Sequence, residues 1–237
     1  MGKEFFAVYH GVKVPPSPLI GPYLRRTLKE GWYEAREVTA ALRLVRPGDR
    51  VLELGAGIGV TGAITALNRF PQKVLCYEPN PNLIEPIRAL HVLNGLSDMI
   101  EVENAVVLAG DAPPPTAKFN VRPNYIGSRL ADEAKRGTVI DVPVHPFDAV
   151  KARFCPDVLL IDIEGAELDF LEKADLTGIR ALVIEFHPKI YGMPGMRHCK
   201  SLLRAQGLDR GPGSTQSVWA AVRVARAGRA EGVSLDA

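Results

Sequence analysis

The sequence of 237 residues lacks several features that would place it in a specialised class of protein. It has only three cysteines (Cys76, Cys155 and Cys199), an odd number without the short spacing of a zinc site. We therefore expect free thiols in a reducing cytoplasm and no disulfide framework. No apolar run approaches the length that spans a membrane. The first ten residues lack the apolar core of a signal peptide and include Glu4.

The sequence also lacks a large excess of one charge. Its 29 Lys and Arg residues nearly balance 27 Asp and Glu residues, which gives a formal net charge of +2. A protein that follows the phosphates of a nucleic acid needs a strongly basic surface. These absences predict a soluble cytoplasmic protein without a nucleic-acid or membrane partner, and they leave its oligomeric state open.

What the sequence does contain is an alternation of strand and helix patterns. Apolar strands are predicted at 51–54, 73–78, 99–107, 157–163, 181–186 and 217–224. Amphipathic helices are predicted between most of them. Continuous apolar strands joined by helices are typical of a parallel sheet with helices on both faces, so we expect an α/β fold.

The pattern also divides the chain into segments. We expect a helical preface over 1–49, a ligand-binding domain over 50–225 and a frayed tail over 226–237. An insertion near 110–138 is polar and rich in proline, and it interrupts the alternation. Its strand-like segment KFNV is expected to pair as a hairpin with VIDVPV at 139–144.

The first strand runs into a glycine-rich turn, ELGAGIG at 53–59. Gly55, Gly57 and Gly59 would let the backbone approach a ligand and let the next helix pack closely on the strand. Glu78 ends the second strand, 21 residues after Gly57. An acid at this distance accepts hydrogen bonds from the hydroxyls of a ribose. Together these features predict a nucleoside site at the carboxyl edge of the sheet.

Two nucleoside cofactors fit this turn. GIGVTG at 57–62 also matches the dinucleotide pattern, so an NAD(P)-dependent oxidoreductase is the alternative function. Glu53 lies just before the first glycine, where a carboxylate would repel a pyrophosphate and attract the ammonium group of S-adenosylmethionine. We therefore favour S-adenosylmethionine.

A second group of titratable residues follows the two most apolar strands. It comprises Asp162, Glu164, Glu167, Glu185 and His187. Because strand side chains alternate between faces, Asp162 and Glu164 should lie on one side. Acids are favourable near a helix N-terminus, so we interpret Glu167 as a helix cap. Burial of an unpaired carboxylate is costly, so we interpret Asp162 as a site residue.

Four segments in this order resemble the FkbM family of S-adenosylmethionine-dependent methyltransferases: VLELGAGIG, YEPNP, LLIDIEGAELDFL and VIEFHP. IDIEGAE is the specific part, since the glycine turn is shared by most methyltransferases of this fold. The resemblance extends from about Gly31 to about Pro188. It implies a Rossmann-like class I methyltransferase fold with a mostly parallel seven-stranded sheet. It also implies O-methylation of a hydroxyl on a sugar or a secondary metabolite.

The resemblance implies that the glycines line the cofactor and that Glu78 binds its ribose. The cofactor residues that we assign are Glu53, Gly55, Gly57, Gly59, Glu78, Pro79 and Asn104. The catalytic candidates are Asp162, Glu185 and His187, with Asp162 or His187 as the base that takes the proton of a hydroxyl. The alternative is a divalent ion held by Asp162, Glu164 and Glu185, which we do not favour because such ions need several oxygen ligands. The expected acceptor is a small molecule or a saccharide.

Overall fold

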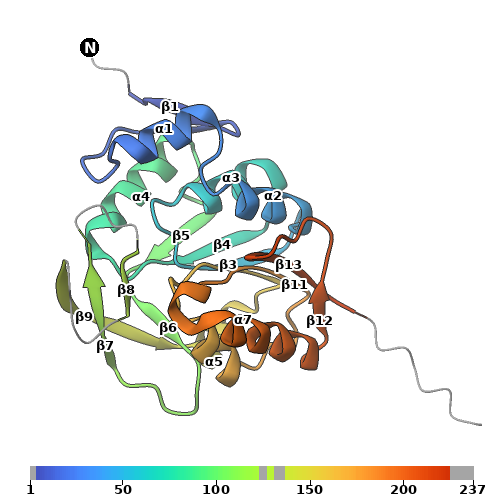
Figure 1. Ribbon diagram of the computed structural model, residues 1–237. Coiled ribbons are helices and arrows are strands. Elements are labelled where there is room, and N and C mark those ends of the chain that lie inside the picture. Colours follow the sequence, from blue (N-terminus) through green and yellow to red (C-terminus); the bar gives the residue numbers. More distant parts are fainter. Residues whose placement is uncertain (1–3, 123–126, 131–136, 225–237) are drawn as a thin grey trace, which may run out of the picture.

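The computed structural model describes residues 4–122, 127–130 and 137–224. The predicted tail at 226–237 and parts of the predicted insertion lie outside these residues. The described chain forms an α/β fold with three sheets (Figure 1). The main sheet has seven strands in the order β12-β13-β11-β10-β3-β4-β5.

The strands of the main sheet are β3 (Arg50–Leu54), β4 (Lys73–Tyr77), β5 (Ile100–Glu103), β10 (Val158–Ile161), β11 (Ala181–Glu185), β12 (Leu208–Arg210) and β13 (Val218–Arg223). β13 pairs antiparallel with β11 and β12, and the other pairs of neighbouring strands are parallel. The expected Rossmann-like, mostly parallel seven-stranded sheet is confirmed. The sequence pattern did not predict β12, because three residues are too few to establish a period.

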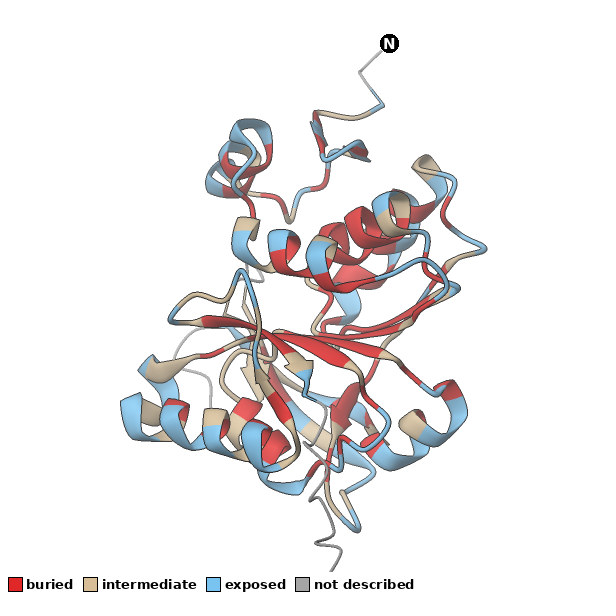
Figure 2. Cartoon of the chain, turned by 90° about the vertical axis from the view of Figure 1, so that its right-hand side faces the viewer, coloured by how far each residue is buried: buried red, intermediate tan, exposed pale blue. Residues whose placement is uncertain are grey.

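Helices cover both faces of the main sheet. One face carries α1 (Pro22–Glu30), α2 (Ala35–Leu44), α3 (Val60–Arg69) and α4 (Pro81–Leu93), and the other carries α5 (Phe147–Phe154), α6 (Glu167–Lys173) and α7 (Pro188–Ala205). Successive strand residues point to opposite faces: Val51 joins the first core, whereas Leu52 and Leu54 join the second. Figure 2 shows the buried strands between helices whose outer surfaces are exposed. The strands are continuously apolar because neither face meets water.

The sequence predicted a helical N-terminal preface, but the preface also contains strands. It begins with a hairpin of β1 (Ala7–Tyr9) and β2 (Val12–Val14), in which Gly11 has a φ of +85° at the turn. Each strand has only three residues, too few for the pattern to be recognised. Buried residues from Ala7 to Val45 belong to the same cluster as Val51, so the preface packs on the domain that it precedes.

The strand predicted at 99–107 is two strands that belong to different sheets. β5 ends at Glu103, whereas β6 (Val106–Leu108) pairs with β9 (Thr138–Pro146). β9 also pairs with β7 (Thr116–Val121), and β7 pairs with β8 (Arg129–Leu130). The hairpin predicted within the insertion is confirmed, with Phe119 opposite Ile140. The insertion therefore contributes β7 and β8 to a four-stranded sheet whose other strands, β6 and β9, flank it in sequence.

Among the described residues, no helix combines the length and the apolar character needed to cross a membrane. All three cysteines are free, as expected, and only Cys155 is exposed.

Candidate functional site

The carboxyl ends of four parallel strands meet at one edge of the main sheet. Leu54 of β3 lies between Tyr77 of β4 and Ile161 of β10, and Ile161 pairs with Ile184 of β11. A cavity of about 430 Å³ opens at this edge, a volume typical of sites for small molecules. Of the predicted site residues, its lining includes Gly55, Gly57, Glu78, Pro79, Asp162, Glu164, Glu185 and His187.

The turn after β3 places backbone directly at the cavity. Gly55 has a φ of +86°, a conformation that residues with a Cβ rarely adopt. The backbone N–H groups of Gly55 and Ala56 both donate to the carbonyl of Tyr77, at 2.9 and 3.1 Å. These hydrogen bonds hold the glycine turn against the end of β4. The next residue after β4 is Glu78, which was predicted to bind the ribose.

Glu78 lies where that ligand was predicted, buried at the cavity wall. One carboxylate oxygen accepts from the N–H of Gly57 and the other from the N–H of Asn80, each at 2.8 Å. Burial raises the pKa of Glu78 to about 7, although the two N–H donors favour its charged form. The carboxylate is thus held in one orientation, and each oxygen keeps acceptor capacity for a further donor.

Three of the predicted cofactor residues act indirectly or not at all at the cavity. The side-chain amide of Asn104 donates to the carbonyls of Glu78 (2.9 Å) and Pro79 (3.1 Å), so it supports the loop rather than lining the cavity. Gly59 caps α3, and a Cβ there would lie 2.9 Å from the side chain of Ile87. Its role is close packing between α3 and α4.

Glu53 does not reach the cavity. Its carboxyl lies under α3, where it accepts from the Cys76 thiol at 2.9 Å and from the backbone of Gly62. Strand alternation explains this placement, since Glu53 shares a face with Val51. Burial raises the pKa of Glu53 to about 8, so the group favours its neutral form. The contact to an ammonium group that the sequence suggested has no geometric support.

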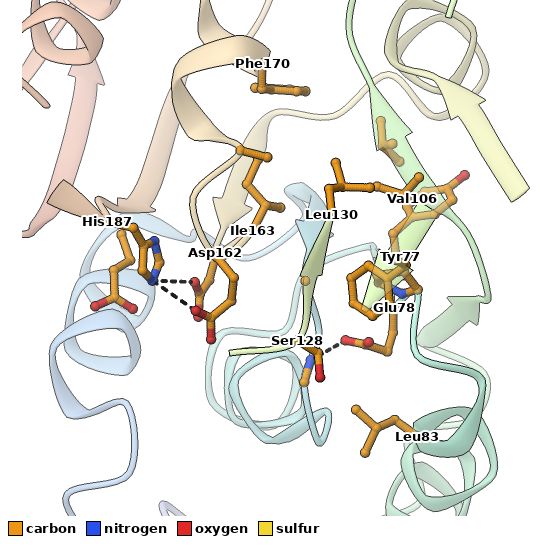
Figure 3. Close-up of a pocket in the computed structure, with 18 of the residues that line it drawn as sticks. Tyr77, Glu78, Leu83, Val106, Ser128, Leu130, Asp162, Ile163, Phe170 and His187 are labelled. Carbon is orange, nitrogen blue, oxygen red and sulfur yellow. Dashed lines mark hydrogen bonds and ion pairs between the residues drawn. The ribbon is translucent and has the colours of Figure 1, made fainter. Parts of the chain in front are cut away.

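Titratable side chains gather at the other end of the cavity (Figure 3). The Nε2 of His187 lies 3.5 Å from Glu164 Oε2 and 3.7 Å from Asp162 Oδ1. Asp162 and Glu164 were predicted to lie on one face of a strand. β10 ends at Ile161, however, so both residues belong to the turn that follows the strand. Glu164 has a φ of +50°, which turns the chain toward α6.

Crowding of carboxylates shifts the protonation of this end. Burial, followed by the charges of Glu185 and Glu164, raises the pKa of Asp162 well above its usual range. The Oδ1 of Asp162 is enclosed and has no hydrogen-bond partner among the described residues. Burial disfavours charge on His187, but the hydrogen bond and charge of Glu167 and the charges of Glu185 and Glu164 outweigh it. They raise the pKa of His187 above its usual 6.5.

Glu34 is a cavity residue that sequence reasoning missed. It lies at the start of α2 with a φ of +42°, and it accepts from the Thr61 hydroxyl at 2.5 Å. Burial raises the pKa of Glu34 to about 7. Glu34 lies within the family resemblance, which begins at about Gly31, but only the packing of the preface on α3 brings its carboxylate to the cavity.

Glu167 was assigned to the helix N-terminus, and it has a second contact. It is fully buried, and its Oε1 accepts from the Gly165 N–H at 2.9 Å. The same oxygen lies 3.0 Å from His187 Nδ1. The first contact is to an N–H that precedes the N-cap Ala166, and the start of α6 has no side-chain cap hydrogen bond, so only the place of Glu167 in the first turn agrees with the prediction. The second contact joins α6 to the residue that precedes Pro188 of α7.

The chain was compared with known proteins. The Methyltransferase FkbM domain matches residues 53–207, which include both ends of the cavity edge described above. The chain belongs to the FkbM methyltransferase family. The resemblance predicted from the four sequence segments is thereby confirmed, and this membership stands against the oxidoreductase alternative.

A curated relative of this FkbM methyltransferase is the ribosomal RNA large subunit methyltransferase E of Verminephrobacter eiseniae (strain EF01-2). The two are 28% identical over 141 residues, which cover 52% of this chain and 53% of the relative. The chain thus spans about half the length of the curated relative that it matches. The name of this relative conflicts with the predicted absence of a nucleic-acid partner. Its sequence similarity to this chain is too low to identify the methyl acceptor.

Two solved structures illustrate the similar folds. TrmK of M. capricolum with S-adenosyl-homocysteine is 9% identical, with 78% of this chain and 65% of that chain covered and a TM-score of 0.47. TYW2 of P. horikoshii with MeSAdo is 16% identical, with 79% and 60% covered and a TM-score of 0.44. Likenesses this distant do not bear on what the FkbM methyltransferase binds.

The FkbM methyltransferase also groups three donors that are close enough to share a metal ion. Asp162, Glu167 and His187 each bring one ligand atom within 4.8 Å of the other two. Of the predicted alternative set, Asp162 alone belongs to this group among the described residues. Because His187 Nδ1 contacts Glu167, Nε2 is the nitrogen that remains for an ion or a proton. Metal-free chemistry stays a prediction.

Proposed function

We propose that this protein transfers a methyl group from S-adenosylmethionine to a hydroxyl of a small molecule or a saccharide. One observation carries the proposal. A single cavity of about 430 Å³ is lined at one end by Glu78 and the glycine turn, and at the other by His187 and Asp162. A donor and an acceptor bound in this cavity would be neighbours, and orientation supplies much of the acceleration in a transfer between two bound molecules.

The nucleoside end suits the adenosine of the cofactor. Gly55 and Gly57 line the cavity with backbone, and the oriented carboxylate of Glu78 has acceptor capacity for ribose hydroxyls. Pro79 and Leu83 add apolar surface for a base. We therefore assign cofactor binding to these residues, with Asn104 as a support of the loop.

The other end suits a positive charge. Glu34, Asp162, Glu164 and Glu185 line the cavity, with His187 as their basic neighbour. S-adenosylmethionine supplies a methyl group on a positively charged sulfonium. Burial raises the pKa values of Glu34, Asp162 and Glu185, and a cation beside these carboxyls favours their charged form, so this end suits a sulfonium better than the pyrophosphate of NAD. The preference for S-adenosylmethionine therefore rests on these four acids and not on Glu53, on which the sequence prediction was based.

In the proposed reaction, His187 is the general base. A hydroxyl is a weak nucleophile, so a base that takes its proton assists the transfer. His187 Nε2 faces the cavity between Asp162 and Glu164, and the ring is only 19% exposed. A cationic ligand nearby opposes charge on the imidazole, so cofactor binding would favour the neutral form that accepts a proton. Asp162 and Glu185 would orient the acceptor by accepting from its other hydroxyls.

The second candidate function is methylation of RNA, which the ribosomal relative favours. An RNA phosphate would have to approach a cavity whose lining includes six acidic residues, Glu34, Glu78, Asp162, Glu164, Asp169 and Glu185. Like charges repel, and a net charge of +2 offers little compensation. We therefore place RNA behind a small hydroxylated acceptor.

Two measurements test the proposal. Calorimetry should show binding of S-adenosylhomocysteine but not of NADH, with Glu78→Ala weakening the former by about 1–3 kcal/mol. Glu85→Ala is the matched control, because the Glu85 side chain is 80% exposed on α4. NADH binding without a response to S-adenosylhomocysteine would overturn the cofactor assignment.

The acceptor is tested with radiolabelled S-adenosylmethionine and a panel of hydroxylated metabolites, saccharides, amines and ribosomal RNA. We expect label in a hydroxylated small molecule, and His187→Ala should lower that turnover by about 10²–10⁴-fold while S-adenosylhomocysteine affinity is retained. Label in RNA alone would favour the second candidate, and label in amines alone would contradict O-methylation.

A further inference from the structure

We propose that Glu167 is a positioning residue, which fixes the ring of His187 so that Nε2 faces the acceptor. The inference rests on the proposed function, in which His187 takes the acceptor proton. It assigns to Glu167 a task other than the helix cap that the sequence predicts.

The contact between the two side chains is specific to one ring nitrogen. Glu167 Oε1 lies 3.0 Å from His187 Nδ1, and a carboxylate only accepts, so Nδ1 carries the hydrogen. In the neutral ring, Nε2 then keeps its lone pair. Nε2 is the nitrogen that lies 3.7 Å from Asp162 Oδ1 at the cavity. Glu167 therefore selects the tautomer that can accept a proton there.

Glu167 is itself held rigidly. Its Oε1 also accepts from the Gly165 N–H at 2.9 Å, and the residue is 0% exposed. The backbone N–H of His187 donates to the Tyr191 hydroxyl at 2.6 Å, which fixes the start of α7. Both members of the pair are therefore fixed by a second contact, as orientation of a base requires.

Burial separates this role from simple capping. A capping carboxylate needs only to meet free N–H groups, and it does so at the helix surface with little loss of hydration. A carboxylate without exposure is costly unless it is paired. The same two helices offer a contrast: Glu172 and His198 lie 3.3 Å apart, with side chains 45% and 51% exposed. That pair has ordinary surface character.

Other charged groups also act on the ring, so the test must isolate Glu167. The groups that interact electrostatically with His187 are Glu37 of α2, Asp162 and Glu164 of the turn after β10, Glu167 of α6, and Glu185 of β11. Among these, Glu167 contacts Nδ1, whereas Asp162 and Glu164 contact Nε2. Without Glu167, the carboxylates that remain in contact with the ring, Asp162 and Glu164, would both lie at Nε2. The ring hydrogen should then move to Nε2.

Nitrogen-15 NMR of the full chain with bound S-adenosylhomocysteine tests this directly. The His187 signals, assigned with His187→Ala, should show hydrogen on Nδ1 in the natural protein and on Nε2 in Glu167→Ala. Glu167→Gln keeps an acceptor oxygen and the side-chain volume, so it should retain the Nδ1 hydrogen. Glu172→Gln on the same helix is the control and should change neither.

Turnover gives the second readout. Glu167→Ala should lower kcat by about 10–10²-fold with KM and S-adenosylhomocysteine affinity nearly unchanged, and Glu167→Gln should restore part of it. In a His187→Ala background, Glu167→Ala should have no further effect. An unchanged tautomer in Glu167→Ala, or an equal loss in both backgrounds, would overturn the proposal. The NMR readout holds even if no hydroxyl is methylated, so the two proposals fail separately.

Discussion

The carbonyl oxygen of Asp162 occupies the space that a side chain on Gly55 would need. An ideal Cβ on Gly55 would lie 1.8 Å from that oxygen. The N–H of Asp162 donates in turn to the carbonyl of Leu54 at 3.0 Å. The glycine turn and the acid turn after β10 are therefore packed against each other, so the proposed nucleoside end and the reacting end form one rigid unit.

Replacement of Gly55 should disturb both ends at once. We expect Gly55→Ala to lower the free energy of unfolding by about 2 kcal/mol or more, because left-handed strain adds to the overlap with Asp162. It should also weaken S-adenosylhomocysteine binding. The matched control is Gly95→Ala: Gly95 has a φ of +66° but nothing within 4 Å of an added Cβ, so only the strain should remain. Equal losses in urea denaturation would contradict this account.

Glu53 should make stability depend on pH. Its pKa is raised from 4.5 to about 8 in the folded protein, so its favourable contribution is complete below pH 4.5 and is lost as the pH rises through about 8. Glu53→Gln stays neutral. At pH 9 it should be more stable than the natural protein, by up to about 5 kcal/mol, and at pH 5 the difference should be small.

Urea denaturation at the two pH values measures this difference. Glu78 and Glu34 also have raised pKa values and titrate in both proteins, and their charges are lesser causes of the raised pKa of Glu53 than its burial is. Glu85→Gln is the exposed control. If Glu53→Gln and the natural protein show the same pH dependence, the buried carboxyl is not the cause.

Trp32 should report on the acceptor. The chain has two tryptophans: Trp32 is 40% exposed and lines the cavity, whereas Trp219 is 3% exposed in the core. Acrylamide should therefore quench mainly Trp32, and a bound acceptor should reduce that quenching. Trp32→Phe is the control, since its remaining emission should ignore both quencher and acceptor. A methylated acceptor that leaves quenching unchanged would show that it does not pass Trp32.

Chelation should have no effect on turnover. Within the part of the chain that the structure describes, the donors that are close enough to share an ion are Asp162, Glu167 and His187, and the Nδ1 of His187 is held by Glu167. Divalent ions such as Mg²⁺ prefer more oxygen ligands than this group provides. We expect EDTA to leave methyl transfer unchanged and added Mg²⁺ or Mn²⁺ to give no increase. Loss with EDTA and recovery with either ion would support the metal alternative.

Local patterns in the sequence predicted the elements that carry the site. The strand end at Leu54, the glycine turn and the acid of Glu78 follow from periodicity and spacing, which depend on neighbouring residues alone. The strand predicted at 157–163 ends earlier than expected, at Ile161. The hairpin β1–β2 and strand β12 escaped, because three-residue strands have no measurable period. The division of the predicted strand 99–107 into β5 and β6 also escaped, since a change of sheet leaves the local hydrophobicity unaltered.

The sequence by itself indicated the family, the alternation of strands and helices along the chain, and most of the acids at the carboxyl edge. Tertiary structure decided which of those acids face the cavity. Glu53 faces α3 because of strand alternation, Glu34 enters from the preface, and Glu167 reaches His187 only because α6 and α7 pack together. Contacts between residues distant in sequence depend on how whole elements pack, and no local pattern encodes that packing.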